Sequence, residues 1–155
     1  MIQEGNQAID FTLEASNGEK VSLSEFQGKN IVLYFYPKDM TPGCTTQACD
    51  FRDYHEQFSQ MDTVILGVSR DPISRHEKFI EKYNLPFALL SDPEAEVSQQ
   101  YGVFKEKNMF GKKAMGIERS TFIIDRQGKV AKVYRKVKVK DHVAEALHFI
   151  QQHLK

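Results

Sequence analysis

Polar and apolar residues alternate at the start of the chain. The alternation runs through residues 11–15 and resumes in residues 21–23, with Asn17-Gly18 between the two runs. A period of two is typical of a strand that buries one face, and Asn-Gly between two such runs favours a two-residue primed turn. The pattern therefore predicts an antiparallel hairpin over residues 10–23.

Longer apolar runs alternate with helical patterns through the rest of the chain. Continuous runs rich in β-branched and aromatic residues predict buried strands at residues 31–36, 63–69, 87–90, 120–124 and 129–135. Apolar positions at helical spacing predict helices at residues 43–61, 71–83, 92–102 and 141–154. The expected helix caps are aspartates, two of them followed by a proline at the first helical position: Asp71-Pro72, Asp92-Pro93 and Asp141. The turn at 125–128 makes the last two strands an antiparallel pair.

This order of elements predicts an α/β fold. Alternating strands and helices, with one hairpin added at each end, give a central mixed sheet with helices on both faces and an N-terminal β-hairpin. A length of 155 residues favours a single domain over residues 1–155. No apolar run approaches the roughly 20 residues that span a bilayer, and no basic stretch with an apolar run opens the chain. We therefore expect a cytoplasmic protein with no membrane partner.

The composition excludes several classes of protein. With 41% hydrophobic residues the chain is too apolar to be disordered, and its only cysteines are Cys44 and Cys49. Two cysteines exclude a disulfide-stapled secreted scaffold and a four-cysteine zinc site, whereas a close pair in the cytosol is typical of redox catalysis. The net charge is zero, but residues 1–104 hold 8 basic and 16 acidic side chains, while residues 105–140 hold 12 and 3.

The segment 37–44 carries the richest chemistry. It lies between a predicted strand and a predicted helix, where unpaired backbone N–H groups point outward. Cys44 falls in the first helical turn, so the positive end of the helix dipole stabilises its thiolate. Gly43 leaves the backbone beside the sulfur uncluttered, and Thr41 supplies a nearby hydroxyl. A threonine before a helix is commonly a cap and a lone cysteine a small buried apolar residue, but their combination favours a nucleophile.

The second cysteine lies five residues further along the same predicted helix. In an ideal α-helix this spacing places the Cα atoms of Cys44 and Cys49 about 8.6 Å apart. A disulfide usually needs about 4.4 to 6.8 Å between Cα atoms. A bond between the two cysteines therefore requires the first turns of the helix to unwind.

The string PKDMTPGCTTQACDFRD at 37–53 resembles the active-site signature of the peroxiredoxins. The second cysteine at i+5 is similar to the Q-type subfamily, the bacterioferritin comigratory proteins. The likeness continues over most of the chain, at residues 66–69, 83–87, 89–93, 101–103 and 118–125. The resemblance implies a thioredoxin-like fold, a thiol peroxidase, and a loop near the active site at residues 105–116.

The resemblance also implies a role for each matching site residue. These are Cys44 as peroxidatic cysteine, Cys49 as resolving cysteine, Thr41 as hydrogen-bond partner of peroxide and thiolate, Arg119 as catalytic arginine, Pro37 as a shield against solvent, and Gly43 as part of the substrate site. Cys44 would attack hydrogen peroxide or an organic hydroperoxide and become a sulfenic acid, which Cys49 would convert to a disulfide. Thioredoxin would reduce that disulfide. No cofactor or metal is expected, and we expect a monomer.

Two other functions remain open from the residues. A redox sensor or chaperone would use the same Cys44–Cys49 switch without turning over peroxide. The basic stretch 105–140 would suit a nucleic-acid-binding module, although lysines that protect an edge strand are the more ordinary explanation. The histidines at 55, 76, 142, 148 and 153 show no metal-ligand spacing and are expected at the surface or in packing.

Overall fold

The computed structural model describes residues 2–155 and has a seven-stranded sheet at its centre. The strand order is β2-β1-β5-β4-β3-β8-β9. Its strands are β1 (Thr12–Ala15), β2 (Lys20–Ser22), β3 (Asn30–Phe35), β4 (Thr63–Ser69), β5 (Ala88–Ser91), β8 (Ser120–Ile124) and β9 (Val130–Tyr134). The pairs β3–β4 and β4–β5 are parallel and the others antiparallel, which confirms the mixed sheet with an N-terminal hairpin.

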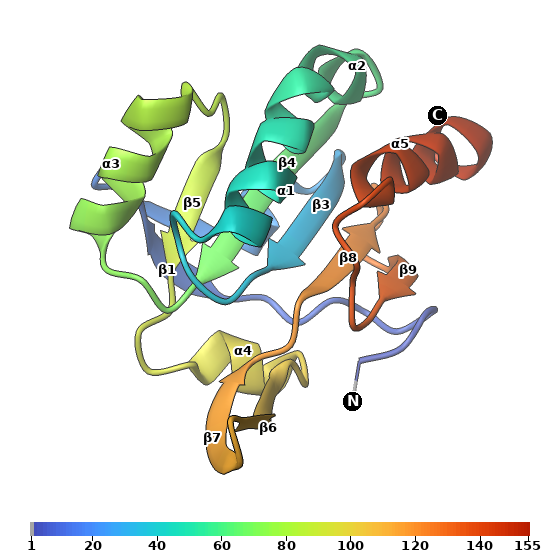
Figure 1. Cartoon of the computed structure of the whole chain (residues 1–155). Helices are drawn as coiled ribbons and strands as arrows, with labels where there is room; N and C mark the ends of the chain where they lie inside the picture. The colour runs from blue at the N-terminus through green and yellow to red at the C-terminus, as the bar shows by residue number, and fades with distance from the viewer. Residues whose placement is uncertain (1) are drawn as a thin grey trace.

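Helices cover both faces of this sheet, as predicted (Figure 1). They are η1 (Leu23–Phe26), α1 (Pro42–Asp53), α2 (His55–Gln60), α3 (Ile73–Tyr83), α4 (Glu96–Gln100) and α5 (His142–His153). Val32 and Tyr34 of β3 enter the core under α1, α2, α3 and α5. Leu33 and Phe35 enter the opposite core, with η1, α4 and the N-terminal segment. Successive β3 side chains thus supply the two cores alternately.

The first hairpin forms, but its turn is not the predicted two-residue primed turn. The N–H of Gly18 donates to Ala15 O at 2.9 Å, and the N–H of Ala15 donates to Glu19 O at 2.7 Å. Gly18 has φ +82, whereas Asn17 is absent from the positive-φ residues. A primed type I′ turn needs positive φ at both central residues, so this is a three-residue loop with a glycine bulge. The Asn17 side chain instead accepts the N–H of Glu19 at 3.0 Å.

Helix starts also differ from the prediction. Pro72 stands at the N-cap of α3 and not at its first helical position, because the Asp71 carboxylate is bonded elsewhere. Asp92 lies outside α4 yet accepts the N–H groups of Val97 and Ser98 at 3.3 and 2.8 Å. Asp141 occupies the N-cap of α5 without a side-chain cap bond.

The predicted helix 43–61 is divided in two. Tyr54, with φ −98 and ψ 3, lies between α1 and α2. Backbone bonds still cross this point, since the N–H of Tyr54 donates to Asp50 O and that of Phe58 to Tyr54 O. The departure is therefore a local change of direction.

The predicted loop 105–116 is in fact a further hairpin. Strands β6 (Phe104–Met109) and β7 (Lys112–Ile117) pair antiparallel outside the seven-stranded sheet (Figure 1). Phe110 and Gly111 connect them with φ values of 52 and 78, so both central residues of this turn are left-handed, as a primed turn requires. Phe110 is fully exposed and Met115 half exposed. The lysine-rich sequence concealed these strands, because lysine is depleted in strands.

No helix among residues 2–155 combines the length and the hydropathy that crossing a bilayer requires.

Candidate active site

Cys44 lies in the first turn of α1, which follows the carboxyl end of strand β3. Residues 36–41 connect the strand to the helix, and Thr41 is the N-cap. Pro42 occupies the start of the helix, where its missing N–H costs nothing. Cys44 is only 2% exposed, so its sulfur lies in a largely water-excluded position.

Arg119 reaches this sulfur from the neighbouring strand. It immediately precedes β8, whose Ser120 pairs with Phe35 at the end of β3. Its Nη2 donates to Cys44 Sγ at 3.4 Å. A Cβ at Gly43 would stand 3.2 Å from the same Nη2, so glycine leaves the guanidinium room to approach. The guanidinium thus places a fixed positive charge beside the sulfur.

Gln47 contacts the other side of the Arg119 guanidinium, and this residue was not predicted from the sequence. Its Oε1 accepts from Nη1 of Arg119 at 2.6 Å, and its side chain is fully buried. Its position three residues after Cys44 puts both residues on one helix face. A glutamine on an otherwise apolar helix face was the available signal.

Thr41 uses its hydroxyl in a way the sequence did not indicate. The hydroxyl donates to the carbonyl of Lys38 at 2.8 Å and makes no cap bond to α1. Its single hydrogen is therefore occupied, while its oxygen lone pairs are free to accept a hydrogen from a peroxide. In this structure Thr41 bonds neither the sulfur nor Arg119. Pro37 is half-buried at the start of the same loop.

Cys49 lies further along α1, and both cysteines are free thiols. Cys49 is partly buried, and α1 is continuous from Pro42 to Asp53 around it. Burial raises the pKa of the Cys49 thiol, and Asp53 and Asp50 raise it further against the opposing effect of Arg52. The structure therefore holds Cys49 as a protonated thiol on an intact helix, out of disulfide geometry with Cys44.

The β6–β7 hairpin contributes a charge close to this site. Burial and the positive charge of Arg119 lower the pKa of Lys107, while Cys44 and Glu118 act in the opposite direction. The Lys107 side chain also passes 3.2 Å from where a Cβ of Gly116 would lie. Lys107 of this hairpin thus lies within electrostatic reach of Arg119 and Cys44.

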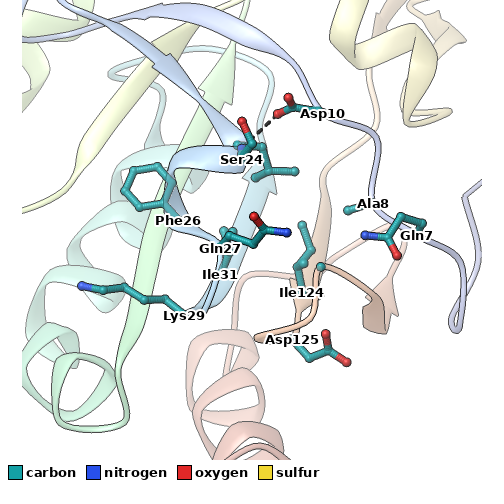
Figure 2. Close-up of a pocket in the computed structure, with 12 residues that line it drawn as sticks. Gln7, Ala8, Asp10, Ser24, Phe26, Gln27, Lys29, Ile31, Ile124 and Asp125 are labelled. Atoms are coloured by element: carbon teal, nitrogen blue, oxygen red, sulfur yellow. Dashed lines mark hydrogen bonds between the residues drawn. The ribbon is translucent and has the colours of Figure 1, made fainter.

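A separate cavity of about 290 Å³ lies at the opposite end of the sheet (Figure 2). Ile31 at the start of β3 and Ile124 at the end of β8 contribute to its wall, together with Phe26 and Asp125. None of the residues around Cys44 borders it. The cavity therefore belongs to a different part of the molecule from the reactive sulfur.

Comparisons with known proteins show the family to which the chain belongs. The sequence model of the AhpC/TSA family matches residues 5–133. The chain is 59% identical over 150 residues to peroxiredoxin Bcp of Bacillus subtilis, covering 97% of this chain and 96% of that protein. It is 40% identical over 152 residues to peroxiredoxin Bcp of Escherichia coli, covering 98% of this chain and 97% of that protein.

Solved structures give the same result. The PrxQ of Xylella fastidiosa superposes with a TM-score of 0.94 at 36% identity, covering 99% of this chain and 98% of that one. Peroxiredoxin Q of Xanthomonas campestris superposes with a TM-score of 0.89 at 42% identity, covering 94% of this chain and 92% of that one. The fold is thus the thioredoxin-like fold of these enzymes. The chain belongs to the AhpC/TSA family and, within it, to the peroxiredoxins, which are thiol-dependent peroxidases.

Proposed function

We propose that this peroxiredoxin reduces hydrogen peroxide and organic hydroperoxides at Cys44. The thiolate attacks one peroxide oxygen, the O–O bond breaks, and the electron pair leaves with the second oxygen, which takes a proton to become water or an alcohol. Cys44 becomes a sulfenic acid. The Xanthomonas campestris bacterioferritin comigratory protein is described by its alkyl peroxide reduction activity, which supports organic hydroperoxides as substrates here.

The observation that carries this proposal is the contact of Arg119 Nη2 with Cys44 Sγ at 3.4 Å. The guanidinium stabilises the attacking thiolate and is placed to stabilise the charge that develops on the leaving oxygen. Backbone N–H groups at Gly43 and Cys44 add to this at the helix start. Thr41 accepts the peroxide hydrogen, and Pro37 limits access of water.

The proposed second half of the cycle uses Cys49. The Cys49 sulfur attacks the sulfenic sulfur of Cys44, a disulfide forms, and the hydroxyl leaves as water with the thiol proton. Thioredoxin then reduces the disulfide by thiol–disulfide exchange and is itself oxidised. A redox sensor would use the same disulfide, and turnover with thioredoxin separates the two functions.

Peroxide consumption coupled to thioredoxin tests this cycle, with the parent protein and with Cys44→Ser and Cys49→Ser. We expect Cys44→Ser to abolish turnover, because no nucleophile remains. Cys49→Ser should consume one equivalent of peroxide and then stop under thioredoxin alone. Normal turnover in Cys44→Ser would exclude the mechanism.

We further propose a monomeric, single-domain cytoplasmic enzyme with no nucleic-acid partner. Support for one domain comes from β3, which supplies side chains to both cores. Sedimentation of the protein, alone and with duplex DNA, tests the monomer and the absence of a nucleic-acid partner together.

A further inference from the structure

A buried polar network lies behind the loop that precedes Cys44. It consists of Tyr36 and Asp39 from the loop, Asp71 after β4, and His76 on α3. Asp39 and His76 are fully buried, and Asp71 nearly so. The steps proposed for the peroxidase do not use these groups.

Every polar group of Asp39 has a partner. Its N–H donates to Asp71 Oδ2 at 2.8 Å, and its carbonyl accepts from Arg75 Nη2 at 3.4 Å. Its Oδ1 accepts from the hydroxyl of Tyr36 at 2.5 Å, and its Oδ2 lies 2.5 Å from Nδ1 of His76. A residue bonded in all four directions at a fully buried position has one position and one orientation.

The partners of Asp39 are themselves fixed to the frame of the molecule. Nε2 of His76 lies 3.0 Å from the carbonyl of Leu90 in β5. Asp71 Oδ2 also accepts from the hydroxyl of Ser69 at 2.5 Å, and the Asp71 carbonyl accepts from Ser91 at 2.6 Å. Asp39 is therefore tied to β4, β5 and α3 at once.

Asp39, Asp71 and His76 also form a cluster that could hold a metal ion. Their ligand atoms are already paired with hydrogen-bond partners, because Asp39 Oδ2 faces His76 Nδ1 and Asp71 Oδ2 accepts two hydrogens. A cation would have to break these contacts. The geometry favours a structural network over a metal site.

We propose that Asp39 is a positioning residue of the peroxide-reacting site, held in place by Tyr36, Asp71 and His76. Only Met40 separates it from Thr41, and Met40 takes a left-handed conformation with φ 65. The position of the Thr41 hydroxyl and of the first turn of α1 is thus set by a fixed point two residues away. This inference rests on the proposed function of Cys44 and specifies what holds that site in its reactive geometry.

The same fixed point limits the unwinding of α1. When the first turns open to let Cys44 and Cys49 meet, Asp39 keeps its contacts, and the segment that moves begins after it. Reduction then lets the helix re-form against an unchanged anchor. The amide of Asp39 should therefore stay protected from hydrogen exchange in both the dithiol and the disulfide forms.

Two variants of Asp39 separate positioning from general stability. Asp39→Ala removes both carboxylate contacts, whereas Asp39→Asn keeps an acceptor for Tyr36 and offers an amide N–H to Nδ1 of His76. We expect Asp39→Ala to slow oxidation of Cys44 by peroxide by roughly 10- to 100-fold, since a shift of about 1 Å costs up to this much. Asp39→Asn should restore most of the rate. Because the chain has no tryptophan, quenched-flow alkylation with mass spectrometry follows the reaction.

Asp92→Ala is the matched control. Asp92 is another buried aspartate with several hydrogen bonds, but it caps α4 on the opposite face of the sheet. It should lower stability and leave Cys44 oxidation unchanged.

The proposal would be overturned if Cys44 were oxidised at the same rate in Asp39→Ala as in the parent. It would also be overturned if Asp92→Ala slowed this oxidation as much as Asp39→Ala does. If Asp39→Ala does not fold, Tyr36→Phe decides, since it removes one contact to Asp39 without changing the packing; an unchanged rate there overturns the proposal. If the parent shows no peroxide reaction at Cys44, the proposed function fails. Alkylation rates of the Cys44 thiol in the same variants would then still test whether Asp39 positions it.

Discussion

A single guanidinium holds two groups of the reactive site together. Nη2 of Arg119 contacts Cys44 Sγ, while Nη1 contacts Gln47 Oε1, so both terminal nitrogens of the planar guanidinium have a partner. A lysine could supply the charge but not both directions. Gly43 belongs to the same arrangement, because any side chain there would crowd Nη2.

The pH dependence of stability should carry the signature of His142. Its pKa is lowered to about 4 by burial and, second, by the positive charge of Arg119, against an ordinary value of 6.5. Between these values the unfolded chain binds a proton that the native protein does not. The contribution of neutral His142 to the free energy of unfolding is therefore fully present above about pH 6.5. It is lost as the pH falls towards 4, and the loss amounts to about 3 kcal/mol.

Urea unfolding at a series of pH values, with His142→Gln as comparison, measures this effect. Glutamine places an amide where Nε2 of His142 meets Thr121 at 2.8 Å, and it does not titrate. The parent should lose more stability than the variant between neutral pH and about pH 4, because only the parent acquires the extra proton. Parallel curves would show that His142 is not the group responsible.

Local sequence predicted some residues of the site better than others. Cys44, Gly43 and Thr41 were identifiable because their chemistry depends on a strand, a loop and a helix start that are consecutive in the chain. The resemblance to the peroxiredoxins supplied Arg119, since a single arginine 75 residues from the cysteine it contacts carries no local signal. His76 was expected in packing or at the surface. Its contact with Asp39 spans 37 residues and left no local signal in the sequence.

At the scale of the element, the start of α1 has features that weaken a helix. Thr45 and Thr46 are β-branched, and the hydroxyl of Thr46 donates back to Pro42 O at 3.1 Å, which weakens a helix. No acidic side chain stabilises the first turn. The second half is anchored instead, since Phe51 is fully buried and stacks on Tyr34 at 4.6 Å.

Disulfide formation should therefore open α1 up to, but not beyond, this anchor. We expect faster amide exchange over residues 43–50 in the Cys44–Cys49 disulfide form and unchanged exchange in α2, because the Cα separation of an intact helix exceeds disulfide range. Exchange measured by mass spectrometry on both forms tests this. Cys49→Ser treated with one equivalent of peroxide is the control and should stay closed. Equal protection of residues 43–50 in the two forms would contradict unwinding.

Helices and strands were predicted correctly where the hydrophobic pattern of the sequence was strong. Strands β4 and β8 lie at the predicted residues, since continuous apolar runs bury on both faces of a sheet. Elements were missed where tertiary contacts overrode the local pattern. The Asp71 carboxylate accepts a hydrogen bond from the backbone N–H of Asp39 and does not cap α3. The lysine-rich segment forms the β6–β7 hairpin because its two strands pair with each other.

At the scale of the whole molecule, the zero net charge conceals an uneven distribution. Residues 105–140 hold 12 basic and 3 acidic side chains. Several of the basic groups are already engaged within the protein: Lys105 with Glu118, Lys113 with Glu106, Arg126 with Asp62, Arg135 with the carbonyls of Gly102 and Ile2, and Arg119 with Cys44. The ion pairs offset part of the positive charge, and the other contacts occupy donors that a phosphate backbone would otherwise receive.

We therefore expect no specific binding of duplex DNA by this enzyme. Sedimentation at moderate salt should give one protein species near 17.9 kDa both with and without DNA. A real nucleic-acid site would bind at about micromolar strength or better and weaken steeply with salt, by a slope of about −0.9 for each phosphate contacted. Micromolar binding with such a slope would contradict the expectation and assign the basic stretch a second function. A concentration-dependent species of twice the mass, without DNA, would contradict the monomer instead, so the two outcomes are distinguished in one experiment.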